Sequence, residues 1–141
     1  MDPRVEKLKT PAECETFIAN ARARGREDLA LEARRWSIEL RSRTHETKSS
    51  VEQECFLAVY ACEDALGGKQ GLWPLIRRHG VLGAVDRVVS RPGDTTGYGA
   101  LVEMGLKELS FEAVVVRYPN EFSFEAVERS RARISKGESH V

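Results

Sequence analysis

The chain has 141 residues, of which 41% are hydrophobic and 31% charged, and its 22 basic residues are balanced by 22 acidic ones. This length is typical of one domain, and the composition is that of a globular protein rather than a disordered or fibrous one. Because the net charge is zero, any attraction for nucleic acid has to come from a local patch of basic side chains. No apolar run approaches the ~20 residues that a membrane span needs, so we expect no membrane association.

The chain has an odd number of cysteines, and none of them forms a CxxC pair. Cys14, Cys55 and Cys62 each stand among apolar neighbours in a helical pattern. This setting predicts buried free thiols rather than disulfides, which is typical of a protein in the reducing cytoplasm.

The N-terminal part of the chain predicts an αα-hairpin after an N-terminal arm at residues 1–9. "TPAE", which begins at Thr10, combines an N-cap hydroxyl, a proline at the first helical position and a glutamate in the first turn. Gly25 is the expected end of this first helix. Glu27 and Asp28 then open a second helix, because acidic side chains are favourable at a helix N-terminus.

A third helix is predicted after Ser49 or Ser50, either of which can cap it. The glycine-rich stretch 67–71 ends this helix, and we expect it to be a hinge between residues 10–66 and residues 72–135 of one domain. The apolar side chains expected to be buried on facing helical stripes are Phe17, Leu29, Trp36 and Cys55.

The stretch from residue 72 to about residue 91 predicts two helices separated by a turn at Gly80. The second of them has an apolar stripe of valines at positions 81, 85, 88 and 89. Helical spacing leaves another set of residues on the opposite, small and basic face: Gly83, Arg87, Ser90 and Arg91.

The pentapeptide "SFEAV" occurs twice, at residues 110–114 and 123–127. The spacing of thirteen residues is too short for an architectural repeat. Each copy reads instead as a helix start, with serine as the N-cap and glutamate in the first turn. The β-branched run "AVVVRY" also allows a strand, but a lone strand would lack partners, so helix is favoured. With a disordered tail at 136–141, the sequence predicts a single compact all-α domain of about seven short helices.

The leading functional hypothesis is nucleic-acid binding through an arginine-rich stretch that begins at Lys69, with DNA as the expected ligand. Phosphates are bound by guanidinium and ammonium groups that converge on one surface, and a glycine there lets a nucleic-acid backbone come close. The predicted contact residues are Lys69, Arg77, Arg78, His79, Gly83, Arg87, Ser90 and Arg91. Arginines at the turn of the first hairpin would extend this patch: Arg22, Arg24 and Arg26.

Two other functions stay open. A helical protein–protein adaptor without catalytic activity would use exposed aromatic anchors, and the candidates are Trp73 and Tyr98. An enzyme would draw on the titratable groups near the glycine-flanked loop "RPGDTTGYG", which are His79, Asp86, Asp94, Tyr98 and Glu103. That loop lacks the pattern of a phosphate-binding loop, and turn and cap roles explain its polar residues.

No metal or cofactor site is expected. The three histidines, His45, His79 and His140, are far apart in the sequence, and none stands at ligand spacing from a cysteine or carboxylate pair. The expected partner is therefore nucleic acid or another protein.

Overall fold

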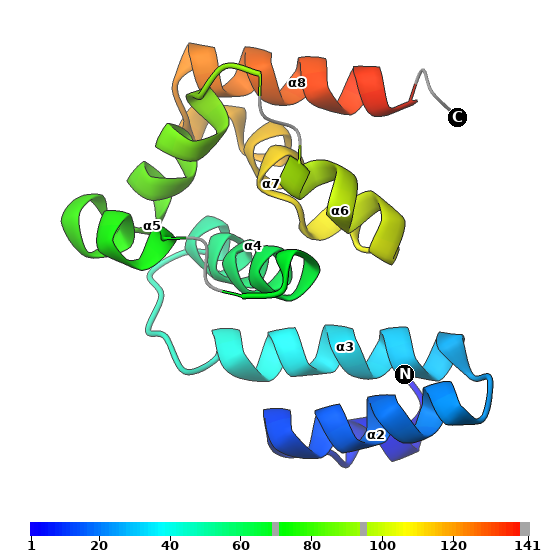
Figure 1. Ribbon diagram of the computed structural model, residues 1–141. Coiled ribbons are helices and arrows are strands. Elements are labelled where there is room, and N and C mark those ends of the chain that lie inside the picture. The colour runs from blue at the N-terminus through cyan, green and yellow to red at the C-terminus, as the bar shows by residue number, and fades with distance from the viewer. Residues whose placement is uncertain (69–70, 94–95, 139–141) are drawn as a thin grey trace. The chain divides into compact units, whose positions relative to one another are not determined.

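A computed structural model describes residues 1–68, 71–93 and 96–138. Within these ranges all regular secondary structure is helical (Figure 1), which confirms the predicted all-α class. The helices group into two compact units, Met1–Glu46 and Thr47–Val141. In the same ranges, no helix combines the length and the apolar character that crossing a membrane requires.

The first unit contains three helices: α1 (Pro3–Glu6), α2 (Pro11–Ala23) and α3 (Glu27–Ser42). The Thr10 hydroxyl accepts a hydrogen bond from the Glu13 N–H at 3.1 Å, so the predicted cap is confirmed. The chain reverses at Gly25, whose φ of +71° lies in the left-handed region. The stretch expected to be an arm contains α1, and its Val5 is 0% exposed.

The core of the first unit is smaller than the apolar stripes predict. It consists of Val5, Ile18, Ala21, Leu29, Ala30 and Ala33. The expectation for Leu29 is confirmed, whereas Phe17 and Trp36 are only half-buried at its edge. The Trp36 indole N–H donates to the Leu8 carbonyl at 2.7 Å. A two-helix hairpin covered by one short helix cannot enclose the full width of both stripes.

The described part of the second unit contains five α-helices and two short 3₁₀ segments. These are α4 (Ser50–Leu66), α5 (Leu72–Ser90), α6 (Thr96–Met104), η1 (Lys107–Leu109), α7 (Phe111–Arg117), η2 (Pro119–Glu121) and α8 (Phe124–Glu138). Ser49 caps α4 by accepting from the Glu52 N–H at 3.3 Å, and Gly67 ends it with φ +79°. The boundary between the units precedes α4, whereas the hinge expected at 67–71 follows it.

Helix α4 is the centre of the second unit, since it packs against α5, α6 and α7, and α8 packs against α5 and α7. The core residues are Val51, Cys55, Phe56, Ala58, Val59, Cys62, Leu72, Val81, Val85, Val89, Phe111, Val114, Val115, Ala126 and Val127. All three cysteines of the chain are free and buried, as predicted. Burial raises the pKa of the Cys55 thiol to about 12.

Both copies of "SFEAV" begin a helix. The Ser110 hydroxyl accepts from the Ala113 N–H at 3.0 Å, and the Ser123 hydroxyl accepts from the Ala126 N–H at 3.1 Å. The run "AVVVRY" belongs to α7 and its C-cap, so the helical prediction is confirmed. Helix α8 extends to Glu138 and therefore includes the first residues of the segment that we expected to be a disordered tail.

Candidate nucleic-acid interface

The candidate residues lie on α5, which bends at Gly80. This glycine has φ +76° and ψ 167°, which interrupts the helix as predicted and separates its two halves. A Cβ added at Gly83 would lie 3.0 Å from the Cβ of His79. The absence of a side chain at position 83 thus leaves room for the close approach of His79.

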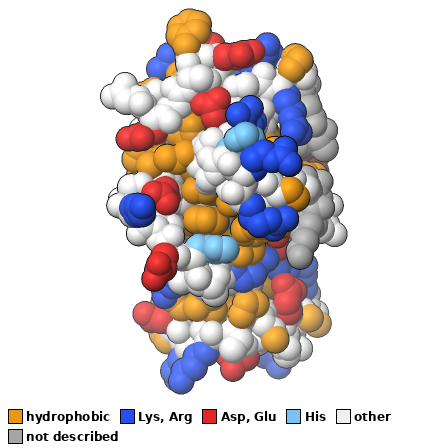
Figure 2. Space-filling model, turned by 90° about the vertical axis from the view of Figure 1, so that its left-hand side faces the viewer, with side chains coloured by type: hydrophobic (Ala, Val, Ile, Leu, Met, Phe, Trp, Pro, Cys, Tyr) orange, Lys and Arg blue, Asp and Glu red, His pale blue; other side chains and the backbone are white. Residues whose placement is uncertain are grey.

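His79 contacts Arg87 in the second half of the helix and lies within electrostatic range of Arg78 in the first half. Its Nδ1 lies 3.4 Å from the Nη2 of Arg87. Desolvation, and then the positive charges of Arg87 and Arg78, lower the pKa of His79 below its ordinary value. The imidazole is therefore neutral at pH 7, and the positive charge of this cluster comes from the two arginines. Figure 2 shows Lys and Arg side chains gathered beside a histidine on this face.

The arginines of α5 differ from most others in the chain. Of sixteen arginines, at least nine have a side-chain nitrogen within 4.0 Å of a carboxylate oxygen: Arg4, Arg22, Arg26, Arg34, Arg43, Arg117, Arg129, Arg131 and Arg133. Arg77, Arg78, Arg87 and the C-cap residue Arg91 are exposed, and none forms such a pair with the residues that the structure describes. Their charges therefore face solvent.

The acidic residue of this helix, Asp86, does not form an ion pair with them. The Asp86 carboxylate accepts from the Ser123 N–H at 2.7 Å and from the Ser123 hydroxyl at 2.9 Å, at the start of α8. It also accepts from the Ser90 hydroxyl at 3.3 Å. Asp86 and the candidate Ser90 thus help to join α5 to α8.

The predicted patch is only partly assembled. His79 and Arg87 are in contact and Arg78 lies within electrostatic range of His79, while Arg77 and Arg91 are exposed on the same element without a contact that ties them to this cluster. Lys69 lies outside the described residues.

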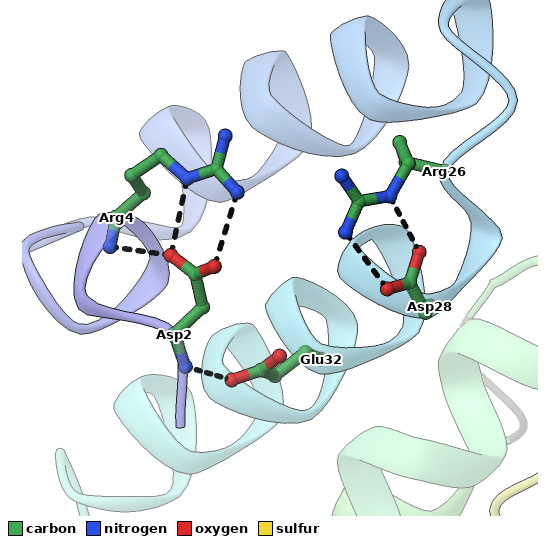
Figure 3. A network of polar contacts seen from close by, with 5 residues as sticks. All are labelled: Asp2, Arg4, Arg26, Asp28 and Glu32. Atoms are coloured by element: carbon green, nitrogen blue, oxygen red, sulfur yellow. Dashed lines mark hydrogen bonds and ion pairs between the residues drawn. The ribbon is translucent and has the colours of Figure 1, made fainter.

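Two of the three hairpin arginines that we predicted to extend the patch are paired within the first unit. Arg26 forms a two-pronged pair with Asp28, with distances of 3.0 Å, beside a similar pair of Arg4 and Asp2 (Figure 3). Arg22 lies 3.6 Å from Glu27. The charges of Arg22 and Arg26 are thus paired within the first unit, whereas Arg24 is exposed and forms no ion pair with the described residues.

The aromatic residues predicted for a protein interface are engaged in the second unit. The Trp73 indole N–H donates to Glu63 Oε2 at 2.9 Å, and its ring packs against Phe56 and Tyr60. Tyr98 is 8% exposed. Trp73 is thus half-buried and Tyr98 is buried, so the surface that each ring offers to a partner is limited.

His79 and Asp86, two of the residues considered for catalysis, are engaged with other groups. His79 neighbours arginines rather than a carboxylate, Asp86 is used in capping, and Asp94 lies outside the described residues. The described ranges also hold no group of three His, Cys, Asp or Glu side chains that could bind a metal ion. No protein-family model, curated protein or solved structure matches this chain.

Proposed function

We propose that this protein binds nucleic acid through the basic surface of α5, defined here as Arg77, Arg78, His79, Arg87 and Arg91. The observation that carries the proposal is the contrast in charge pairing. In a chain of zero net charge, where most arginines are paired with carboxylates, four exposed arginines on one element have no such partner among the described residues. Guanidinium groups match phosphate oxygens in geometry and charge.

The chemistry of this surface favours phosphates over base edges. The arginines are exposed on a bent helix, and the neutral imidazole of His79 adds a hydrogen-bonding group between them. Contacts of this kind position a protein on the nucleic-acid backbone without reading the sequence. We expect binding that is electrostatic, salt-dependent and weakly selective among sequences, with duplex DNA as the first substrate to test.

A helical adaptor is the second candidate function, and one feature of α8 favours it. Phe124, the first residue of that helix, is 81% exposed. Exposed aromatic side chains are frequent anchors in protein–protein interfaces. An adaptor that docks through this ring would bind its partner with little dependence on salt.

The test is a titration of a labelled DNA duplex and a labelled single strand at several salt concentrations, read by fluorescence anisotropy. For each phosphate contact, the slope of log K against log salt should be about 0.9 on duplex DNA. We expect Arg87→Gln and Arg91→Gln each to reduce that slope by about one. Arg131→Gln is the matched control, because Arg131 is exposed in the same unit but is paired with Glu128 at 3.3 Å.

The outcomes separate the two functions. Reduced slopes for the two α5 variants, with wild-type behaviour of Arg131→Gln and unchanged melting curves, would support the basic surface. If no binding is measured at low salt, or if all three variants bind like the wild type, the nucleic-acid function is wrong for this surface. The adaptor function would then be supported if Phe124→Ser abolished binding to a protein partner whose affinity for the wild type does not depend on salt.

A further inference from the structure

The second unit contains a pocket of about 280 Å³ that the basic surface of α5 does not explain. Six apolar side chains line it: Leu66, Leu72, Leu75, Val88, Leu101 and Phe111. The volume lies just below the range of about 300–1,000 Å³ that is usual for small-molecule sites. Polar groups of Arg91, Tyr98, Glu112 and Arg133 also line it, so an occupant of this pocket has to be small and amphiphilic.

The wall of the pocket also carries an ion pair that is withdrawn from water. Arg133 Nη1 lies 3.3 Å from Glu112 Oε2, and the two side chains are only 7% and 8% exposed. Arg133 is fixed in place because its Nη1 donates to the Val89 carbonyl at 2.8 Å and its Nη2 donates to the Arg91 carbonyl. Burying such a pair costs desolvation free energy, and apolar residues in its place often give equal stability.

The charges along the wall are unequal. Arg91 and Arg133 both line the pocket, whereas Glu112 is its one acidic residue among those described. Because the Glu112 carboxylate is paired with Arg133, one positive charge is left over. A space lined by both leucines and fixed polar groups, with one excess positive charge among the described residues, is suited to a molecule with a single anionic head group.

We propose that this pocket binds a small monoanionic amphiphile, such as a medium-chain carboxylate. The head group contacts the guanidinium groups of Arg91 and Arg133, and the chain packs among the leucines of α4, α5 and α6. Of the residues that line the pocket, Arg91 also belongs to the basic surface of α5. Val88 is next to Arg87 in the sequence. The binding site itself is separate from the cluster of Arg78, His79 and Arg87.

The probe is sodium octanoate, titrated into the ¹⁵N-labelled full chain and followed by NMR and by isothermal calorimetry. Octanol and octylamine serve as probes of the same chain length without a charge and with the opposite charge. Octanoate should shift the amide signals of Cys62, Leu75 and Leu101, which line the pocket, and should bind at least about fivefold more tightly than octanol. Octylamine should show no saturable binding.

Two substitutions locate the site. Leu75→Trp replaces a half-buried pocket residue with a larger one and should abolish octanoate binding by filling the space. Arg91→Gln, at an exposed position, should weaken it by about three- to fivefold. Arg87→Gln is the matched control, since Arg87 is on the same helix but does not line the pocket. Melting curves of all variants check that each is folded.

Several results would overturn the proposal. It fails if octanoate does not bind, if octanol or octylamine binds as tightly as octanoate, or if a folded Leu75→Trp variant binds like the wild type. If Leu75→Trp does not fold, the octanoate affinities of Arg91→Gln and Arg87→Gln are compared instead. Equal affinities of these two variants would contradict binding in the pocket.

Discussion

Gly80 interrupts α5 with φ +76° and ψ 167°, a backbone conformation that residues with a Cβ rarely adopt. We therefore expect Gly80→Ala to destabilise the second unit. An added Cβ there would meet no other atom within 4 Å, so backbone strain alone sets the loss. That strain is about 1–3 kcal/mol, and each kcal/mol lowers Tm by roughly 4–8 °C in a folded unit of this size.

The matched control is Gly99→Ala in α6. Gly99 is exposed, its φ is not positive, and a Cβ added there would also meet nothing within 4 Å. The same substitution should therefore stabilise the protein by about 0.5–1 kcal/mol, because alanine favours a regular helix. Both changes can be measured by thermal and urea unfolding, followed by far-UV circular dichroism.

The sign of the Gly80→Ala effect tests the bend itself. If α5 were one continuous helix, alanine at position 80 would raise Tm, as it should at position 99. A stabilised Gly80→Ala variant would thus refute the interrupted helix, and with it the packing of His79 against Gly83. An unchanged Tm would show that the chain relaxes into another conformation at negligible cost.

Two further changes in stability follow from the charge pairs. Arg133→Met leaves Glu112, whose side chain is 8% exposed, without this partner. The substitution should lower the free energy of unfolding in urea by about 3–5 kcal/mol. The control Arg131→Met, at an exposed pair, should change it by less than about 1 kcal/mol. Equal effects would mean that the buried pair is hydrated. Arg26, chiefly through its side-chain hydrogen bond, lowers the pKa of Asp28 from 3.8 to about 2. The stabilisation of the folded state by this pair is therefore present above pH 3.8 and is lost as the pH falls through about 2. Asp28→Asn should make the first unit less sensitive to acid between these pH values, as followed by circular dichroism, and an unchanged acid transition would contradict the assignment.

The sequence by itself determined where most helices begin and end. Thr10, Ser49, Ser110 and Ser123 each accept a hydrogen bond from an N–H three residues ahead, and Gly67 ends α4 in the left-handed region. These are local rules that need only a few neighbouring residues, so they can be recognised without knowing the fold. The two copies of "SFEAV" are one such rule used twice.

The sequence also showed the arginine-rich stretch, but not which arginines are paired. Arg22 and Arg26 were predicted to extend the basic patch, yet their partners Glu27 and Asp28 stand on the next helix only a few residues away. Spacing across a turn does not fix which side chains meet, because the direction of the turn decides it. Arg133 carried a weak signal, since it continues the buried stripe of α8 at helical spacing from Ala126 and Ser130.

Only the tertiary structure decided how deeply each stripe is buried. Trp36 and Phe17 stand at positions as regular as that of Leu29, but they remain half-buried because the short α1 covers only part of the hairpin. Tyr98, in a glycine-rich stretch without a clear apolar pattern, is buried instead. Burial depends on which elements pack against a face, and those contacts join residues that are distant in the chain, whereas caps and glycine turns depend on neighbours alone.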